Sequence, residues 1–353
     1  MDFFSLLATI KTGRDLTESE AAESISAIME AKASQEQVKE FLLALRVKGE
    51  ALSEVVGAAR AMRRHAVPLD VHVKGMLVDT CGTGGDNLKT ANISTLAALV
   101  VAGVGVAVAK HGNRSVTSAC GSADLLEALG VKIDVPPDVV KRCIEEAGFG
   151  FLFAPQFHPA MKAVAPIRKA LGVPTIFNLL GPLTNPAGVR HHLVGVADET
   201  KLELYAQALE ALGSERALAV HGADGQDEIS TAGPTDVAEL QVEGTQARIV
   251  HYQVKPEQFG IRPASLQDLR AGSPAENAAI AQEVLAGTPG PVRDAVLLNA
   301  AAALYVAGAA ADIAAGLVMA AESVDQGKAR GVLERVREIA SAPAGPRNDA
   351  RKS

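Results

Sequence analysis

The chain has no tryptophan, and aromatic residues make up only 3% of its 353 residues. Its hydrophobic core must therefore be built mainly from alanine, valine, leucine and isoleucine, because hydrophobic residues still account for 48% of the chain. Charged residues make up 21%, which is close to the globular average and argues against widespread disorder. At roughly 150 residues per domain, this length predicts about two domains.

Cysteine is scarce as well. Cys81, Cys120 and Cys143 form an odd, scattered set without a C-x-x-C pair, which favours reduced thiols in a cytosolic protein and argues against a zinc site. The N-terminal segment lacks the basic start, apolar centre and cleavage pattern of a signal peptide. The longest apolar run, residues 96–109, is too short for a membrane span and is interrupted by two glycines. We therefore expect a cytoplasmic protein with no membrane partner.

An excess of positive charge is also missing. The chain has 34 Lys and Arg against 41 Asp and Glu, a formal net charge of -7. No overall positive field exists that would attract a nucleic-acid backbone or an anionic membrane surface. We expect no nucleic-acid partner.

The first seventy or so residues carry helical signals. Apolar residues recur at helical spacing, and Thr17-x-x-Glu20 and Ser34-x-x-Gln37 have the form of capping boxes at helix starts. From about Met76, short apolar runs alternate with Gly-rich turns and amphipathic helices, which predicts βα units in a largely parallel sheet. The predicted strands of this part are 76–80, 104–109, 150–153, 193–197 and 217–221, with an antiparallel pair in 235–255.

A second helical stretch begins near His158 and interrupts the α/β pattern, so the helical domain should combine two separated segments. The predicted fold class is α/β, with a small α-helical domain beside a larger α/β domain whose mainly parallel central sheet is flanked by helices. The predicted boundaries are 1–71 with about 158–190 for the helical domain, 72–157 with about 191–341 for the α/β domain, and 342–353 for a polar tail. The stretch 292–340 is predicted to be Ala-rich helix.

A glycine-rich segment, DTCGTGGD at 79–86, follows the first predicted strand. Its glycines let the backbone turn tightly and direct N–H groups at a phosphate or pyrophosphate. No Gly-Lys-Ser/Thr follows, which excludes a Walker loop, and Asn87 replaces the final glycine of a dinucleotide fingerprint. From this segment alone, a phosphate cradle and a purely structural turn remain equal alternatives.

Two further segments favour the phosphate cradle. Residues 90–95 (TANIST) open an apolar helix, and helix N-termini bind anions, although Ser94 or Thr95 could instead only cap the helix. Residues 110–118 (KHGNRSVTS) follow a second strand and combine two cations, an amide and three hydroxyls. Gly121-Ser122 then begins another helix. Open α/β sheets bind ligands at the carboxyl edge of their strands, where these segments should meet.

Two other features concern charged side chains. Asp227 and Glu228 form the only adjacent acidic pair at a predicted strand end, and such oxygen ligands suit Mg²⁺, especially when substrate phosphates also hold the metal. Arg168 lies among apolar residues, where a carboxylate-binding role and an ordinary surface position remain open alternatives. His191 and His192 lack metal-ligand spacing and are interpreted as structural.

These segments resemble those of the anthranilate phosphoribosyltransferase family of tryptophan biosynthesis. No single motif decides the resemblance, but the ordered set is specific and covers nearly the whole chain. Its members are GTGGD at 82–86, NIST at 92–95, KHGNRSVTS at 110–118, GSADLLEALG at 121–130, HPAMK with IRKALG at 158–172, TIFNLLGPLTNP at 175–186 and DEIS at 227–230. Ala119-Cys120 departs from the family pattern, and a small buried residue is the favoured interpretation of Cys120.

The resemblance implies a nucleoside-phosphorylase-like phosphoribosyltransferase that forms a homodimer through its helical domain. Its reaction would join the amine of anthranilate to ribose C1 of phosphoribosyl pyrophosphate (PRPP) and expel pyrophosphate, with Mg²⁺ as cofactor. Because the aromatic amine of anthranilate is neutral at pH 7, no protein nucleophile is required.

The resemblance also implies residue roles. The implied PRPP contacts are Gly82, Gly85, Asp86, Thr90, Asn92, Ile93, Ser94, Thr95, Lys110, His111, Gly112, Asn113, Arg114, Ser115, Val116, Thr117, Ser118 and Ser122. The implied anthranilate contacts are Gly82, Asn113 and Arg168. The implied Mg²⁺ ligands are Ser94, Asp227 and Glu228.

Two rival functions remain at this point. A pyrimidine nucleoside phosphorylase would share the fold but use phosphate and a nucleoside, whereas DTCGTGGD and the acidic pair favour pyrophosphate with a metal. A noncatalytic nucleic-acid-binding relative is the second rival, and the acidic net charge counts against it.

Overall fold

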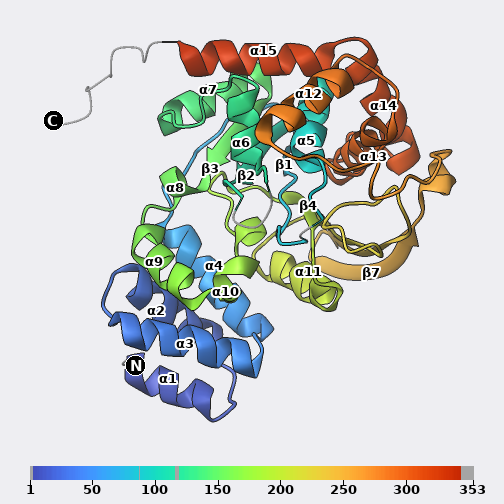
Figure 1. The fold of residues 1–353 in the computed structure, drawn as a ribbon. Helices are drawn as coiled ribbons and strands as arrows, with labels where there is room; N and C mark the ends of the chain where they lie inside the picture. The colour runs from blue at the N-terminus through green and yellow to red at the C-terminus, as the bar shows by residue number, and fades with distance from the viewer. Residues whose placement is uncertain (1–2, 87, 116–118, 343–353) are drawn as a thin grey trace.

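The computed structural model describes residues 3–86, 88–115 and 119–342. A small helical part lies at one end of the molecule, and a larger part is built on one sheet with helices around it (Figure 1). The predicted fold class is therefore confirmed. The polar tail predicted at 342–353 lies outside the described residues except for Ala342. None of the helices in the described part is long and apolar enough to span a membrane.

The helical part begins with helices that precede the first strand: α1 (Phe3–Lys11), α2 (Glu18–Met29), α3 (Gln35–Lys48) and α4 (Leu52–His65). The capping boxes predicted for α2 and α3 are confirmed, because Thr17 and Ser34 each accept a hydrogen bond from the backbone three residues later. These caps satisfy N–H groups that a helix start would otherwise leave unpaired.

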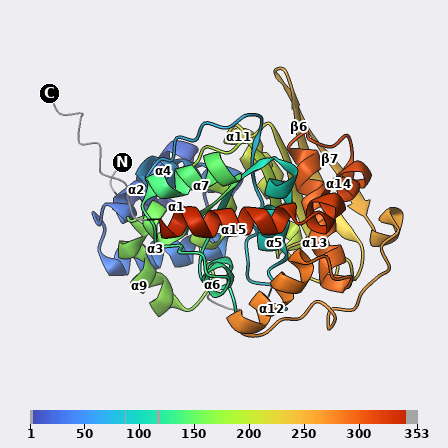
Figure 2. The same ribbon diagram turned by 90° about the horizontal axis from the view of Figure 1, so that it is seen from above.

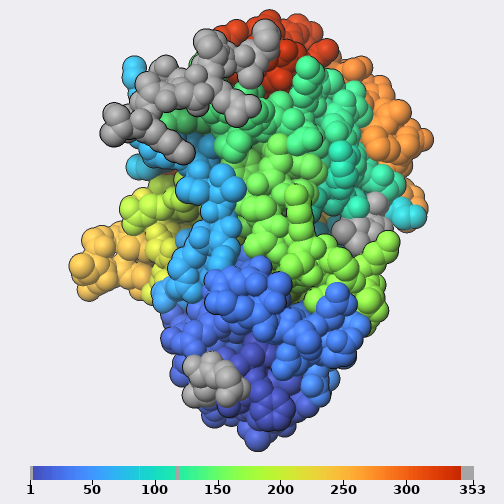
Figure 3. Space-filling view, turned by 90° about the vertical axis from the view of Figure 1, so that its left-hand side faces the viewer, coloured from blue at the N-terminus to red at the C-terminus, as the bar shows by residue number. Residues whose placement is uncertain are grey.

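A later segment packs against these helices. It contains α9 (Met161–Leu171), α10 (Ile176–Leu179) and the 3₁₀ helix η1 (Gly181–Leu183). Val164, Ile167 and Phe177 from this segment enter the hydrophobic cluster that α1 to α4 form. Figure 3 shows this green segment in contact with the blue N-terminal helices. Two stretches that are far apart in the sequence therefore share one core.

The sheet has seven strands in the order β3-β2-β1-β4-β5-β6-β7. The strands are β1 (Leu77–Asp79), β2 (Ala107–Gly112), β3 (Phe149–Phe153), β4 (His191–Gly195), β5 (Arg216–Gly222), β6 (Thr235–Glu243) and β7 (Gln246–Val254). β1 to β5 run parallel, whereas β6 and β7 are antiparallel, as predicted for 235–255. The β6–β7 hairpin projects from the body of the molecule (Figure 2).

The two faces of the sheet bury different sets of helices. On β5, Leu218 and Val220 belong to one hydrophobic cluster and Ala217 and Ala219 to the other, because successive side chains of a strand point to opposite faces. The second cluster continues into the helical part. The sheet and the helical part are therefore joined by apolar packing.

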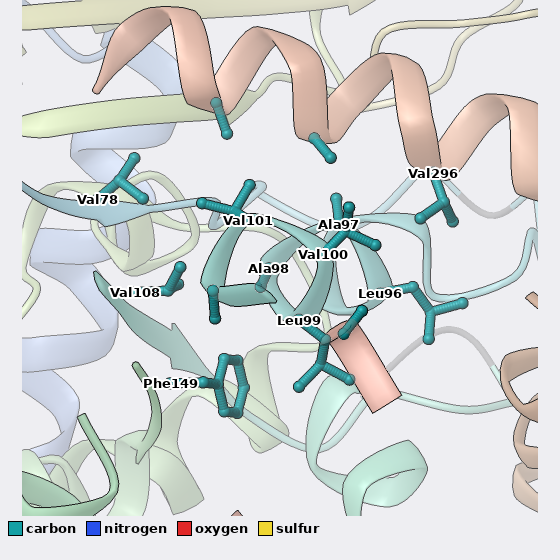
Figure 4. Packing of buried hydrophobic residues seen from close by; sticks show 14 of the residues in the cluster. Val78, Leu96, Ala97, Ala98, Leu99, Val100, Val101, Val108, Phe149 and Val296 are labelled. Carbon is teal, nitrogen blue, oxygen red and sulfur yellow. The ribbon is translucent and has the colours of Figure 1, made fainter. Parts of the chain in front are cut away.

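The helices of the larger part connect and cover these strands. They are α5 (Ile93–Val104), α6 (Ser122–Ala128), α7 (Pro137–Ala147), α8 (Ala154–Phe157), η2 (Glu199–Lys201), α11 (Leu202–Ala211), η3 (Pro256–Phe259), α12 (Pro274–Leu285), α13 (Pro291–Val306), α14 (Ile313–Asp325) and α15 (Lys328–Ser341). Figure 4 shows α5 side chains packed among Val78, Val108 and Phe149 of the strands, with Val296 of α13 beside them.

Several predicted boundaries are wrong. The strand predicted at 193–197 is β4, which spans His191–Gly195. A strand was expected from Val104, but α5 continues to that residue and ends at Gly105, whose φ of 105° stops the helix, and β2 begins only at Ala107. Valine and alanine suit either element, so composition alone did not place this boundary. The predicted helical stretch 292–340 is divided into α13, α14 and α15.

A buried arginine links the helical part to the larger part. Arg63 of α4 donates to the carbonyl oxygens of Leu183 at 2.8 Å and Leu212 at 3.2 Å. Burial lowers the pKa of its guanidinium. Because both acceptors are backbone groups at the ends of helices, Arg63 fixes how α4 lies against them.

Candidate active site

The predicted phosphate-binding segments meet at one edge of the sheet. They follow β1 and β2, and the acidic loop follows β5, so each begins at the carboxyl end of a parallel strand. β1 lies between β2 and β4, which is where strand order reverses in this sheet. Such a switch point leaves a crevice for ligands. Because β3 leads from this same edge through α8 to α9, the edge faces the helical part.

The glycine-rich loop after β1 is tied to the end of β4. The Thr83 N–H donates to the Gly195 carbonyl at 2.9 Å, and the Thr83 hydroxyl accepts from the Ala197 N–H at 3.1 Å. Gly84 and Gly85 are exposed and have φ values of 65° and 89°. Apart from its own chain neighbours, no atom of the described residues lies within 4 Å of a Cβ built on either glycine. The loop is thus held from below while its outer face stays open.

The lower face of the loop is closed by Asp227. A Cβ on Gly82 would lie 2.5 Å from Asp227 Oδ2, and a Cβ on Gly195 would lie 1.6 Å from the Asp227 carbonyl oxygen. The Gly84 N–H donates to Asp227 Oδ2 at 2.7 Å. Only glycine at 82 and 195 lets Asp227 approach this closely.

Asp86, Asp227 and Glu228 form a carboxylate cluster beside this loop. Desolvation raises the pKa of both Asp227 and Glu228, and the neighbouring negative charges raise it further. Desolvation also raises the pKa of Asp86, whose carboxyl group is hydrogen-bonded to that of Asp227. The Ser94 N–H donates to Glu228 Oε1 at 3.1 Å. The structure therefore brings together the predicted metal ligands Ser94, Asp227 and Glu228.

Lys110 lies beneath these loops on β2 and is only 2% exposed. Its ammonium group donates to the Thr80 carbonyl at 2.9 Å and to the Thr80 hydroxyl at 3.3 Å, and no ion pair to it is present in the described part of the chain. Its charge lowers the pKa of Asp79, but burial outweighs this effect and raises that pKa to about 6. Lys110 is therefore a buried cation that forms no ion pair with a carboxylate among the described residues.

The N-terminus of α5 completes this side of the site. Asn92 is the N-cap residue, and no side-chain capping bond forms there, so neither Ser94 nor Thr95 caps the helix. The Asn92 amide instead donates to the Cys120 carbonyl at 3.1 Å, while Thr90 pairs with Arg270 in an isolated bridge. Ile93 and Thr95 are buried, and the Ile93 N–H donates to the Ala91 carbonyl at 2.7 Å.

The segment after β2 is only partly available for binding. Arg114 pairs with Asp124 at 2.9 Å and with Glu127, which satisfies its guanidinium within the protein. The Ser122 hydroxyl donates to the Asn113 carbonyl at 3.2 Å. Gly112 is the last residue of β2, and Ser115 follows Arg114 in the loop. The predicted contacts Val116, Thr117 and Ser118 lie outside the described residues.

Arg168 lies on α9 in the helical part. Its guanidinium donates to Asn178 Oδ1 at 3.2 Å and stacks on the Phe177 ring at 5.8 Å. Burial lowers its pKa, and it has no carboxylate partner among the residues that the structure covers. No hydrogen bond there joins it to Gly82 or Asn113. It is a half-buried cation with unused capacity to bind an anion.

Family models match both parts of the chain. The a/b domain of a glycosyl transferase family matches residues 74–330, and the helical bundle domain of a glycosyl transferase family matches residues 4–66. An anthranilate phosphoribosyltransferase from Symbiobacterium thermophilum is 52% identical over 336 residues, which cover 95% of this chain and 97% of that protein. The chain belongs to the anthranilate phosphoribosyltransferase family.

Solved structures of anthranilate phosphoribosyltransferases share this fold. The enzyme from Thermus thermophilus is 47% identical, with a TM-score of 0.89, and the match covers 96% of this chain and 99% of that one. The enzyme from Saccharomyces cerevisiae in complex with PRPP and Mg is 31% identical, with a TM-score of 0.87, and the match covers 96% and 98%.

The carboxylate cluster of this anthranilate phosphoribosyltransferase family member fits a divalent cation. Its carboxyl groups are crowded and desolvated, and oxygen is the ligand that Mg²⁺ prefers. The described residues contain no group of three or more His, Cys, Asp and Glu side chains that could hold a metal on its own. Mg²⁺ usually completes its shell with water and substrate phosphates. Asp227, Glu228 and the Ser94 hydroxyl could therefore hold the ion only together with such oxygens.

A pair of buried histidines lies between the two parts, and of the two only His111 is among the predicted PRPP contacts. The rings of His111 and His158 have centroids 5.0 Å apart, and burial lowers their pKa values to about 4 and about 3. His111 Nδ1 lies 2.9 Å from the Gly181 carbonyl, and His111 Nε2 is buried with no hydrogen-bond partner among the described residues. A backbone hydrogen bond with Thr184 raises the pKa of His158, but burial has the larger effect. His158 belongs to the HPAMK motif, which was the only feature of the sequence that could have indicated a role for it.

The sequence predicts reduced cysteines and a small buried residue at Cys120. Cys120 is buried as expected, and burial raises its thiol pKa to about 11. The described cysteines are all free thiols. A thiol with a raised pKa is a poor nucleophile, so Cys120 is a packing residue.

The open face of the glycine loop generates a prediction. Gly84→Ala should lose roughly 1–2 kcal/mol of stability from its left-handed φ. It should also weaken PRPP use at least tenfold, because the new methyl group projects into the space where the phosphate backbone would approach. Unfolding by urea and the KM for PRPP measure the two effects.

Gly244→Ala is the matched control for this prediction. Gly244 lies at the tip of the β6–β7 hairpin with a φ of 62° and equally open surroundings. It should lose similar stability while its KM for PRPP stays normal. Equal kinetics in both variants would show that the glycine loop is only structural.

Proposed function

We propose that this protein transfers the phosphoribosyl group of PRPP to the amine of anthranilate and releases pyrophosphate, in tryptophan biosynthesis. One observation supports this proposal most strongly. The open glycine loop, the buried cation Lys110 and the carboxylate cluster lie together at one edge of the sheet. Relatives that match almost the whole chain bear this activity in their names.

PRPP would lie across the carboxyl edge of the sheet. The backbone of the glycine loop and the N-terminus of α5 would approach its phosphates, as backbone nests and helix N-termini do. Lys110 would add a positive charge from below. The implied contacts Asp86, Thr90, Asn92 and Ser122 line the same edge. The yeast relative was solved in complex with PRPP and Mg, which supports PRPP as the ligand.

Anthranilate would lie between this edge and the helical part. Arg168 would bind its carboxylate, because it is a half-buried cation with no acidic partner among the described residues. Asn113 and the backbone at Gly82 would contact the ring and the amine from the other side. This places the two substrates on opposite sides of the crevice.

The chemistry requires positioning more than a protein nucleophile. The amine nitrogen forms the new bond to ribose C1, the bond from C1 to the pyrophosphate oxygen breaks, and its electron pair leaves with pyrophosphate. Holding the amine behind C1 removes much of the entropy cost of the reaction. Backbone N–H groups of the glycine loop would stabilise the charge growing on the leaving group. When bound at Ser94, Asp227 and Glu228, Mg²⁺ would neutralise more of that charge.

A direct assay tests the proposed function. When the protein is mixed with PRPP, anthranilate and Mg²⁺, the fluorescence of anthranilate should decrease and pyrophosphate should be released. Phosphate with a pyrimidine nucleoside should give no free base. Phosphorolysis without anthranilate consumption would instead support the nucleoside phosphorylase.

The oligomeric state and location form a separate proposal. The protein is a homodimer joined through its helical part, because Phe4 of α1 and Val47 of α3 are 70% and 86% exposed. Light scattering should give twice the mass of one chain, and a single-chain mass would contradict this. It functions in the cytoplasm, and its net charge of -7 favours neither nucleic-acid nor membrane partners.

The role of Arg168 generates a second prediction. Arg168→Ala should lower kcat/KM for anthranilate about 30-fold or more, because removing one partner of a buried charge pair costs about 2–5 kcal/mol. The KM for PRPP should change little. Lys169→Ala is the matched control, since Lys169 is the exposed next residue on α9. Equal damage to the use of both substrates, or to neither, would contradict the assignment.

The carboxylate cluster generates a third prediction. The double change Asp227→Asn with Glu228→Gln keeps the side-chain shapes but removes two negative charges. The Mg²⁺ concentration for half-maximal rate should rise at least about tenfold, since changes to residues behind metal ligands already cost roughly 10–100-fold. Extra Mg²⁺ should restore part of the rate.

A matched control and a pH series complete this test. Glu145→Gln with Glu146→Gln removes the same charge from an exposed acidic pair on α7 and should leave the metal requirement unchanged. If Asp227 and Glu228 were instead a general acid and base, the wild-type rate would have a bell-shaped dependence on pH that the double variant lacks. Added Mg²⁺ would then not restore the rate of the variant. An unchanged Mg²⁺ requirement would refute the metal-site role.

A further inference from the structure

One polar side chain, Asn299, interrupts the otherwise apolar set of buried residues of α13, next to the loop that carries the carboxylate cluster. Asn299 of α13 is fully buried, and every other buried residue of this helix, all within the described chain, is alanine, valine or leucine. Burying an amide is costly unless its hydrogen bonds are made. An asparagine in such a helix therefore needs partners that an apolar residue could not replace.

The partners of Asn299 are backbone groups of a single neighbouring residue. The Ile229 N–H donates to Asn299 Oδ1 at 2.9 Å, and Asn299 Nδ2 donates to the Ile229 carbonyl at 2.9 Å. The same amide nitrogen also donates to the Ala295 carbonyl at 2.9 Å, one turn earlier in α13. The Asn299 amide thus hydrogen-bonds both the N–H and the carbonyl of Ile229. The bond to Ala295 in turn fixes the Asn299 amide to α13.

This grip acts on the carboxylates through one peptide bond. The N–H of Ile229 belongs to the planar unit that contains the carbonyl of Glu228, so fixing it fixes the direction in which the Glu228 side chain leaves the backbone. On the other side, close packing against Gly195 limits how far Asp227 can move. The two acidic residues are therefore held between a glycine backbone and the Asn299 amide.

We propose that Asn299 is a positioning residue that fixes Asp227 and Glu228 in the geometry needed to hold a divalent cation. This inference rests on the proposed function for the identity of the cation. The amide touches neither substrate nor metal and acts only through the Ile229 backbone. A side chain that can both donate and accept is required, because each Ile229 group left unpaired would be a buried polar group without a partner.

Two variants of Asn299 test the proposal, with one control. Asn299→Ala removes the grip and leaves room for water, and Asn299→Leu removes it while keeping the volume filled. Ser323→Ala on α14 is the matched control, because it removes another buried side-chain hydrogen bond, from Ser323 Oγ to the Val100 carbonyl, far from the cluster. All three should lose some thermal stability.

The first measurement needs no substrate or metal. Hydrogen exchange of the Ile229 amide in metal-free protein should be as slow as that of the α13 amides in the wild type and at least about tenfold faster in both Asn299 variants. The control should leave it unchanged. Fast exchange of Ile229 in the wild type would overturn the proposal even if neither variant folded.

The second measurement reports the effect on the cation. Both Asn299 variants should need at least about tenfold more Mg²⁺ for half-maximal rate, with little change in the KM for anthranilate. Calorimetric titration of Mg²⁺ alone should show the same weakening. A Mg²⁺ requirement equal to that of the Ser323→Ala control would overturn the proposal. A wild type that lacks transferase activity but keeps the slow Ile229 exchange and the Mg²⁺ binding would refute the proposed reaction and leave the positioning role standing.

Discussion

The close approach of Asp86, Asp227 and Glu228 is the constraint on which the site depends. Like charges at such short range repel, and each carboxyl group is also poorly solvated, so its pKa is raised. The protein tolerates this arrangement because the loop is packed tightly from behind. In the proposed function, a bound cation would offset the repulsion between these carboxylates.

The rest of the fold explains how such crowding is maintained. Parallel strands bring three separate loops to one edge, and α13 packs against β4 and β5 directly behind the acidic loop. The helical part is joined to the sheet by a shared hydrophobic cluster and by Arg63. His158 follows α8, and Arg168 lies on α9, which packs against the N-terminal helices. Both residues are therefore held at a defined position relative to the loops at the sheet edge.

Sequence reasoning succeeded where the controlling interactions are local. The capping boxes at Thr17 and Ser34 involve residues three apart, and the glycine-rich turn follows its strand directly. It failed where distant contacts decide the outcome. The boundary between α5 and β2 lies in a run of apolar residues that suit either element. The ion pairs of Arg114 with Asp124 and Glu127 were likewise not visible from the sequence, and the predicted contact of Arg114 with PRPP stays a prediction.

The residues missed altogether depend on contacts across the fold. His158 was part of a quoted motif, yet its meeting with His111 requires the end of β3 to lie beside the end of β2. Asn299 stands in an Ala-rich helix that sequence periodicity treats as core. Its importance is visible only once the helix is placed against residue 229, seventy positions earlier in the chain.

The glycines of the site have two separate physical purposes, and the motif alone does not distinguish them. Gly82 and Gly195 are required because Asp227 lies against their backbone, so a methyl group there would push the acidic loop outward. A Cβ added to Gly84 or Gly85 would meet open space within the described structure, and these glycines are required for their left-handed φ and for that open space. The backbone of the loop at Gly82 lies directly against Asp227. In the proposed complex, this close contact would bring the phosphates of a ligand above the loop within reach of a cation held by the carboxylates.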